Sequence, residues 1–313
     1  MSNYTFRPLQ SDSDWQEALA IRAKLHPEFP VSQAEYESED KMFEDKVRYR
    51  NLIIKEQHIV GMVMFAEAFW YSEPNGFAGR VVALPDDLET FECGFRHLLE
   101  LAEKHQAAKI HSGIEDRRPD IVSLAERLGW KTKMAQKVSR LDLANFDKQV
   151  GDIDYEILSL PELKVRKPDT WLHDYWRLDM DLLRDVPMTG EFVEDTIEFF
   201  EQFLDHPGFS HEGLLFAVMP DGTLAGTTSL SPSLVDPMVG ITALTGVRRE
   251  YRRRGIAKAL KTRSLLWGRE QGIEFVMTDN EEKNPMYLLN EELGFRHVFN
   301  QLAMVWERQS LPN

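Results

Sequence analysis

Two segments of the chain resemble each other: LAERLGWK at residues 124–131 and LNEELGFR at residues 289–296. Their separation is 289 minus 124, or 165 residues. The same shift matches two further pairs of positions, Gly61 with Gly226 and Val82 with Val247. Three matches in one order and at one offset are typical of an internal repeat. We therefore expect one fold to occur twice in this chain.

The length and composition agree with two folded domains. A chain of 313 residues can bury two cores of ordinary size, and its 42% hydrophobic and 28% charged residues are usual for a globular protein. The polar segment NFDKQVGDID, residues 145–154, separates the two copies. We place the domain boundary there, which gives domains over residues 1–148 and 149–313.

Both copies have the pattern of a mixed α/β fold. In the second copy, apolar spacing predicts two helices, then a hairpin with a PDGT turn, and then alternating strands and helices. The expected helices cover residues 171–186, 192–204, 255–272 and 285–292, and the expected strands cover 214–219, 224–230, 239–247, 274–280 and 302–308. The first copy predicts a hairpin over 51–65, a strand over 79–84, a helix start at Pro85–Asp87, and a helix whose apolar face carries Phe95, Leu98, Leu99 and Ala102.

Charge and composition exclude several classes of function. The formal net charge of -15 argues against a general nucleic-acid-binding protein. Cys93 is the only cysteine, so neither an intrachain disulfide nor a cysteine-cluster metal site can form, and we expect no metal. No apolar run has the roughly 18 residues that would span a bilayer, and the first residues do not resemble a signal peptide. We therefore expect a cytoplasmic protein that has no membrane partner.

Three consecutive arginines, Arg252, Arg253 and Arg254, directly precede Gly255 in this acidic chain. A predicted strand ends near Val247 before them, and a predicted helix follows. A helix start presents unpaired N–H groups and the positive end of the helix dipole, and glycine lets a phosphate approach the backbone. Arginines add charge-assisted hydrogen bonds. The context predicts a pyrophosphate site, with a solvated basic turn as the simpler alternative.

The pattern Arg-x-x-Gly-x-Ala, formed by Arg252, Gly255 and Ala257, resembles the coenzyme A-binding motif of the GNAT N-acetyltransferase superfamily. The segment TDNEEKNPMYLLNEELGFR, residues 278–296, is similar to the strand, asparagine and GF signature of that family. Through the repeat, the whole chain resembles a tandem two-domain member. The resemblance implies acetyl-CoA as cosubstrate and transfer of its acetyl group to a primary amine of a small molecule or peptide by the C-terminal domain.

The resemblance also implies a set of cofactor-binding positions. Backbone groups that hold the pyrophosphate are expected at Arg252, Arg253, Arg254, Gly255, Ile256, Ala257 and Lys258, and backbone groups that pair with the pantetheine arm, like an added strand, are expected at Thr245, Gly246 and Val247. Asn284 resembles the family's cofactor-contacting asparagine. It equally fits the N-cap of a helix that begins at Pro285.

The catalytic groups are less well defined by the sequence. Many family members use a tyrosine four residues before the glycine of GF, but Asn290 stands there and cannot act as an acid. Tyr287, on the same helical face, is the substitute that we expect, with core packing as the alternative. The base remains open among Glu191, His211, Asp236 and Glu250, and an aromatic acceptor pocket or a core role is open for Trp171, Tyr175, Trp176 and Phe192.

The first copy lacks the basic turn. The shift of 165 places Asp87, Leu88, Glu89, Thr90 and Glu92 opposite Arg252, Arg253, Arg254, Gly255 and Ala257. Losing two charge-assisted hydrogen bonds of about 1.5–3 kcal/mol each lowers affinity at least about a hundredfold. We expect a degenerate N-terminal domain with a packing or substrate-shaping role. A non-catalytic acyl-CoA-binding or sensing protein is the alternative function, and the sequence leaves the oligomeric state open.

Overall fold

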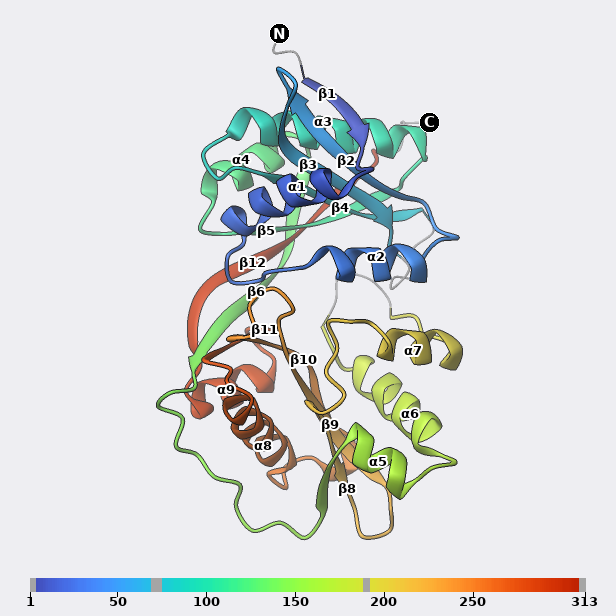
Figure 1. Cartoon of the computed structure of the whole chain (residues 1–313), viewed down its shortest axis with the longest axis vertical. Coiled ribbons are helices and arrows are strands. Elements are labelled where there is room, and N and C mark those ends of the chain that lie inside the picture. Colours follow the sequence, from blue (N-terminus) through green and yellow to red (C-terminus); the bar gives the residue numbers. More distant parts are fainter. Residues whose placement is uncertain (1–3, 69–74, 188–191, 310–313) are drawn as a thin grey trace. The chain divides into compact units, whose positions relative to one another are not determined.

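The computed structural model describes residues 4–68, 75–187 and 192–309 (Figure 1). The chain divides into two compact units. Among the described residues, unit 1 contains those up to Gln136, residues 192–193, and those from Phe299 onward. Unit 2 contains Lys137–Pro187 and Glu194–Val298.

Unit 1 contains a mixed sheet with strand order β1-β2-β3-β4-β5-β12. Its neighbouring strands are antiparallel except for the parallel pair β4 and β5. The elements are β1 (Tyr4–Pro8), α1 (Asp12–Leu25), α2 (Gln33–Met42), β2 (Arg48–Lys55), β3 (His58–Glu67), β4 (Gly76–Ala83), α3 (Leu88–Lys104), β5 (Lys109–Glu115), α4 (Pro119–Arg127) and β12 (Arg296–Glu307), with β6 (Trp130–Asp142) running on into unit 2.

The core of unit 1 forms where α3 packs on the sheet. Phe95, Leu98 and Ala102 are buried on one face of α3, as the apolar spacing predicts, and Leu99 packs at the edge of the same core. Asp87 caps α3, which confirms the predicted helix start. The sequence analysis did not identify β1, α1 and α2. Capping boxes at Ser11 and Ser32 start the two helices, which carry no strong apolar stripe.

In unit 2 the strands follow the order β6-β11-β10-β9-β8-β7 of the same sheet, and β10 and β11 are parallel. Helices α8 and α9 lie on one side of these strands, and α5, α6 and α7 lie on the other (Figure 1). The elements are β7 (Glu156–Ser159), α5 (Leu160–Arg166), α6 (Trp171–Leu183), α7 (Ile197–Leu204), β8 (Leu214–Val218), β9 (Leu224–Pro232), β10 (Val239–Val247), the short 3-10 turn η1 (Arg249–Tyr251), α8 (Ile256–Glu270), β11 (Phe275–Glu281) and α9 (Pro285–Leu293).

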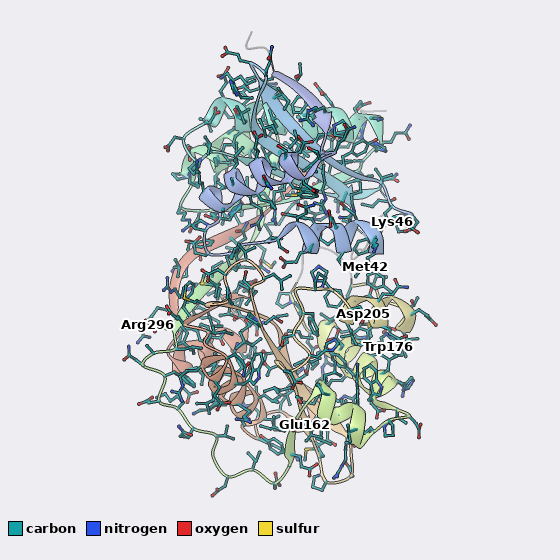
Figure 2. All side chains as sticks on the ribbon, viewed as in Figure 1. Met42, Lys46, Glu162, Trp176, Asp205 and Arg296 are labelled. Carbon is teal, nitrogen blue, oxygen red and sulfur yellow. The ribbon has the colours of Figure 1, made fainter. Side chains whose placement is uncertain are left out.

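Most predicted elements of unit 2 are present, with local differences at their ends. Strand β10 has the predicted bounds, and α9 ends at Gly294, whose φ of 105° only glycine adopts easily. Helix α7 begins later than predicted because Thr196 caps it, accepting a hydrogen bond from Phe199 N at 3.2 Å. The short elements β7 and α5 were not predicted; a capping box between Ser159 and Glu162 starts α5 (Figure 2).

The last strand of each sequence copy contributes to the other unit. Strand β12 pairs with β5 in unit 1, where Met304 enters the core and Asn300 Nδ2 donates to Asp116 Oδ2 at 2.6 Å. The end of β6 contributes Leu141 to a core of unit 2, and Leu143 N, just beyond it, donates to Glu274 O at 2.8 Å. The compact units therefore differ from the proposed domains 1–148 and 149–313, which follow the sequence copies.

Candidate functional site

Strands β10 and β11 begin as a parallel pair and then separate. Their pairing covers Val239–Ile241 and Phe275–Met277. Thr242 Oγ1, the next side chain on β10, still lies 2.9 Å from Thr278 Oγ1. Beyond this point, the edge of β10 toward β11 has no ladder partner among the described strands. We call this place the β10–β11 opening; it offers backbone groups to an extended ligand.

Helix α8 begins beside the end of β10 without any side-chain cap. Its N-cap residue is Gly255, with φ 77° and ψ 0°, and the first turn of α8 contains no acidic residue. A Cβ placed on Gly255 would meet nothing within 4 Å, so the space over this backbone is open. Unpaired N–H groups and the positive end of the helix dipole therefore face open space.

The three arginines before Gly255 have different surroundings. Arg252 Nε donates to Val247 O at 2.8 Å, and its guanidinium also pairs with Asp185, which Arg249 contacts as well. These two arginines lower the pKa of Asp185 to about 2. Arg254 lies over the Tyr251 ring at 5.4 Å. Arg252 thus fixes the turn, in addition to any part it plays toward a ligand.

Arg253 is the arginine that is free to reach a ligand. Its φ is 66°, in the left-handed region that a bulky residue rarely adopts. The side chain is exposed and has no hydrogen bond or ion pair with any residue that the structure describes. Lys258, one turn into α8, pairs instead with Glu292 at 2.5 Å.

The predicted pantetheine positions lie on the last part of β10. On the β9 side, Thr245 Oγ1 lies 2.7 Å from Thr228 Oγ1, and the backbone of Val247 pairs opposite Gly226. Gly246 lies under α6: an added Cβ would come within 2.9 Å of Leu182. Ile256 and Ala257 of α8 pack with Val247 in one apolar cluster, which holds the helix start close to the strand end.

Asn284 is the N-cap of α9. Its Oδ1 accepts a hydrogen bond from Met286 N at 3.0 Å, with Pro285 in the first turn. This confirms the capping interpretation of Asn284. Its expected contact with the cofactor stays a prediction.

Tyr287 and Asn290 are both buried on α9. Lys137 Nζ lies 4.7 Å from the centre of the Tyr287 ring. Burial, followed by the neighbouring Glu291, raises the pKa of Tyr287. Asn290 Nδ2 donates to Asn280 Oδ1 at 2.5 Å, while Asn290 Oδ1 has no hydrogen-bond partner among the described residues. Asn290 therefore contributes a buried amide at the position where the resemblance implies a tyrosine.

The base candidates named from the sequence are not brought together. His211 Nε2 donates to Leu204 O at 2.9 Å, and Asp236 Oδ1 accepts from Met238 N at 3.1 Å. Glu250 is exposed in the turn η1. Glu191 lies outside the described residues.

The four aromatic residues also separate. Tyr175 is 4% exposed and packs edge-on against Phe200 and Phe216, so it belongs to the core. Trp171 lies under Lys164 Nζ at 4.4 Å. Trp176, labelled in Figure 2, donates from Nε1 to Asp195 O at 3.0 Å. Phe192 belongs to unit 1 and the other three to unit 2.

Asp179 on α6 is a candidate that the sequence analysis missed. Burial, and then the charge of Asp195, raises the pKa of Asp179 to about 7. It lies one helical turn before Leu182, on the face of α6 that covers Gly246 of β10. A carboxyl group with a pKa near neutrality can accept a proton under ordinary conditions. No motif marks it, because its pKa depends on burial.

A second pair of titratable groups, buried Lys261 and exposed Asp279, lies where β11 leaves β10. Burial lowers the pKa of Lys261 on α8 to about 8, and burial raises the pKa of Asp279 on β11. The charge of Asp279 partly offsets the shift of Lys261, and the charge of Lys261 partly offsets that of Asp279. Asp279 follows the paired part of β11 and reaches solvent. Asp279 thus places a titratable group next to the β10–β11 opening.

The turn of unit 1 that corresponds to Gly255 is filled by its own side chains. Asp87 Oδ1 accepts from Thr90 N at 3.0 Å, and Asp87 Oδ2 accepts from Thr90 Oγ1 at 2.6 Å. Glu89 pairs with Lys55 at 2.8 Å. The start of α3 is therefore satisfied by carboxylates of the chain itself.

Two features are absent from the residues that the structure describes. Within the described ranges, no helix is both long and apolar enough to cross a membrane. The same residues contain no group of three or more histidine, cysteine, aspartate or glutamate side chains placed to hold a metal ion.

Comparison with known proteins identifies the fold. Residues 172–295 match the acetyltransferase (GNAT) family, and no curated protein matches the chain. A tandem GNAT protein from the clavulanic acid biosynthesis pathway has a similar structure, with TM-score 0.78, 19% identity, and coverage of 99% of this chain and 100% of that one. A GCN5-related N-acetyltransferase from Sphaerobacter thermophilus has TM-score 0.70, 15% identity, and coverage of 97% and 95%. An acetyltransferase of the GNAT family from Colwellia psychrerythraea has TM-score 0.61, 12% identity, and coverage of 97% and 100%.

These matches confirm the tandem mixed α/β fold expected from the repeat. Residues 172–295 therefore match the GNAT acetyltransferase family, and the whole chain has the fold of tandem GNAT proteins.

Proposed function

We propose that the chain is an acetyl-CoA-dependent N-acetyltransferase whose second half transfers the acetyl group to a primary amine of a small molecule or peptide. One observation carries the proposal. The uncapped start of α8 at Gly255 lies next to the end of β10, whose edge toward β11 has no ladder partner there. The first feature suits a pyrophosphate and the second suits an amide-containing arm, which are the two parts of coenzyme A.

The proposed cofactor contacts follow from this arrangement. Backbone N–H groups from Arg252 to Lys258 hold the pyrophosphate, and Arg253 supplies the free guanidinium. Backbone groups of Thr245, Gly246 and Val247 pair with the pantetheine arm. Asn284 contributes an additional contact from the start of α9.

The chemistry assigned to this site is direct transfer. The amine nitrogen attacks the thioester carbonyl carbon, an amide bond forms, and the carbon–sulfur bond breaks. Asp179 takes the proton that the attacking amine must lose, since its pKa of about 7 lets it act as a base near neutral pH. The Asp179–Asp195 pair also favours an acceptor that arrives as a cation.

The leaving thiolate needs a proton, which the proposal assigns to Tyr287. Its raised pKa keeps the phenol protonated at neutral pH. A Tyr287→Phe variant should lower kcat about tenfold and leave KM unchanged, because the phenol acts only when sulfur departs. An unchanged kcat would leave Tyr287 with a packing role beneath Lys137.

The deciding experiment measures free-thiol release from acetyl-CoA with a panel of primary amines. Asp179→Asn should lower kcat/KM by about a hundredfold or more and remove a rise in rate centred near pH 7. The raised pKa means that the folded state favours the protonated carboxyl. Ionised Asp179 therefore lowers the free energy of unfolding above about pH 4, and Asp179→Asn should raise Tm at pH 8. Asp205→Asn, an exposed change on the same side of the sheet, is the matched control (Figure 2).

A non-catalytic acyl-CoA-binding or sensing protein is the second candidate. It is favoured by the buried amide of Asn290 at the position where many relatives carry the catalytic tyrosine. Tight acetyl-CoA binding without thiol release for any amine would support this candidate and reject the enzyme.

A further inference from the structure

Two carboxylates stand at the end of α6, where a helix favours basic residues. Asp181 lies in the last turn of α6, and Asp185 lies two residues beyond the helix. Both oppose the negative end of the helix dipole, so neither stabilises α6 by itself. Arg184, between them, donates to Asp181 Oδ1 at 2.8 Å. Asp185 takes its partners from another segment of unit 2.

The partners of these carboxylates lie between β10 and α8. Arg249 donates to Asp185 twice, from Nη2 to Oδ1 at 2.5 Å and from Nε to Oδ2 at 3.3 Å. Arg252 Nη2 donates to the same Oδ2. A longer pair joins Asp181 to Arg248 at 3.4 Å. Asp185 therefore receives hydrogen bonds from both ends of the 3-10 turn η1.

Asp185 is the stronger of the two links between α6 and this segment. Its side chain is 24% exposed, whereas that of Asp181 is 46% exposed, and exposed ion pairs contribute little. Arg252 extends the link to the strand, because its Nε donates to Val247 O at 2.8 Å while its Nη2 donates to Asp185. Asp185 thus joins the end of α6 to η1 and to the end of β10.

The backbone that follows η1 is strained. Arg253 has φ 66° and Gly255 has φ 77°. A left-handed arginine is costly, and such strain persists only where surrounding contacts hold the backbone. Gly255 has no side chain with which to cap α8. Asp185 holds Arg252, the residue directly before Arg253, and so restrains the strained segment from outside.

Helix α6 is a firm support for this contact, whereas the segment that it holds is exposed. Tyr175, Leu178, Met180 and Leu182 are buried along α6. The residues from Arg249 to Arg254, which we call the arginine turn, are exposed or half-buried. Asp185 therefore restrains the arginine turn and adds little to the placement of α6.

The first copy lacks both arginines of this link. In the register of the repeat, Leu84 and Asp87 stand opposite Arg249 and Arg252, since 249 minus 165 is 84 and 252 minus 165 is 87. Asp87 caps α3 directly, so that helix start is fixed by its own side chain. The link to α6 occurs in the copy whose helix start has no cap.

We propose that Asp185 is a positioning residue of the cofactor site: it holds the arginine turn on α6, so that the N–H groups from Arg252 onward stay arranged for a pyrophosphate. The inference rests on the proposed function, because it takes the arginine turn as the place where coenzyme A binds. Asp185 touches no ligand in this interpretation and acts through Arg252.

The charge of Asp185 separates positioning from simple electrostatics. A carboxylate beside an anion site repels the anion, so removal of its charge would tighten coenzyme A binding if charge alone acted. Positioning predicts the opposite direction. Asp185→Asn should weaken coenzyme A binding about fivefold, because the arginine turn is no longer held. Calorimetry on the full chain measures Kd.

Steady-state kinetics separate positioning from general damage to the fold. In Asp185→Asn, KM for acetyl-CoA should rise about fivefold, while kcat at saturating acetyl-CoA should change less than about twofold. Asp185→Glu keeps the carboxylate and should recover part of the affinity. Asp205→Asn removes an equal charge from the exposed residue after α7 and should change Kd less than about twofold (Figure 2).

Hydrogen exchange of the ligand-free chain tests the link without any cofactor. In Asp185→Asn, the backbone amides of residues 249–255 should exchange at least about fivefold faster, and those of α6 should keep their rates. If the wild-type chain does not bind coenzyme A, the proposed function fails, and exchange alone decides whether Asp185 holds the arginine turn. The inference is overturned if exchange in the arginine turn is unchanged, or if Asp185→Asn binds coenzyme A as tightly as the wild type or more tightly.

Discussion

Helices α3 and α8 follow corresponding strands in the two halves of the chain, yet their N-termini are built in opposite ways. Asp87 caps α3 and Glu89 adds an acid to its first turn. Gly255 starts α8 with no side-chain cap, no acid in the first turn, and three arginines before it. The same helix start is therefore closed by the chain's own carboxylates in unit 1 and left open in unit 2.

The difference shows that a duplicated fold can preserve a helix and yet satisfy its start in two different ways. A carboxylate cap satisfies the N–H groups and the dipole that would otherwise attract a phosphate. Once the cap is present, an external anion has neither free donors nor a favourable field. The expected degeneracy of the N-terminal copy for coenzyme A stays a prediction, and the following variants test it.

The largest effect is expected from reversing the basic turn. Replacing Arg252, Arg253 and Arg254 together by Glu should weaken coenzyme A binding at least about a hundredfold, because charge-assisted contacts become repulsive. Calorimetry measures Kd. Because Arg252 also contacts Asp185, the single variant Arg253→Glu is tested beside the triple one. It should retain the fold and still bind coenzyme A about tenfold more weakly than the wild type. Unchanged affinity in both would remove the proposed pyrophosphate site.

A smaller effect is expected from filling the open space over the turn. Gly255→Ala should weaken coenzyme A binding about tenfold, because its Cβ occupies the proposed phosphate position. Gly272→Ala is a matched control at the other end of α8, with φ 85° against 77° and equally empty surroundings. Both variants should lose similar stability. Equal loss of affinity in both would attribute the effect to backbone strain alone.

Removing the cap of α3 should affect only stability. Asp87→Ala deletes the acceptor for Thr90 N and should lower the free energy of unfolding by about 1 kcal/mol. Urea titration measures this change. Coenzyme A affinity should remain that of the wild type. If the variant bound a second coenzyme A more tightly than the wild type does, the cap alone would have kept the cofactor from unit 1.

The smallest effect concerns the ion pairs that hold Arg252. Arg249 and Arg252 lower the pKa of Asp185 to about 2, below its ordinary value, so their stabilisation is present at neutral pH and is lost as the pH falls from about 4 toward 2. Asp185→Asn should be slightly less stable than the wild type at pH 7, since the pairs are partly exposed. The difference in Tm should vanish near pH 2; a constant difference would point to packing.

Much of unit 2 could be predicted from local pattern. The β-rich run of β10 and the Asn-Pro and Gly signals around α9 each act within a few residues, so the sequence alone locates these elements. Element ends were less predictable where a side chain caps the helix, as at Thr196. The proposed cofactor turn could be found because its arginines and glycine are consecutive.

The base candidate could not be found in this way. Asp179 has no distinctive neighbour in sequence, and its pKa of about 7 arises from burial and from Asp195, sixteen positions away. The sequence instead suggested Glu250 and Asp236, which the fold leaves outside any cluster.

The sequence by itself determined that one α/β fold occurs twice, and that only the second copy has a basic, glycine-containing helix start. The tertiary structure decided which strand completes which sheet, because β12 pairs with β5 and no local pattern specifies a partner nearly two hundred residues away. It also decided which carboxyl group has a shifted pKa. Burial is a property of the packed chain, so a residue's charge state at neutral pH follows from its position in the fold.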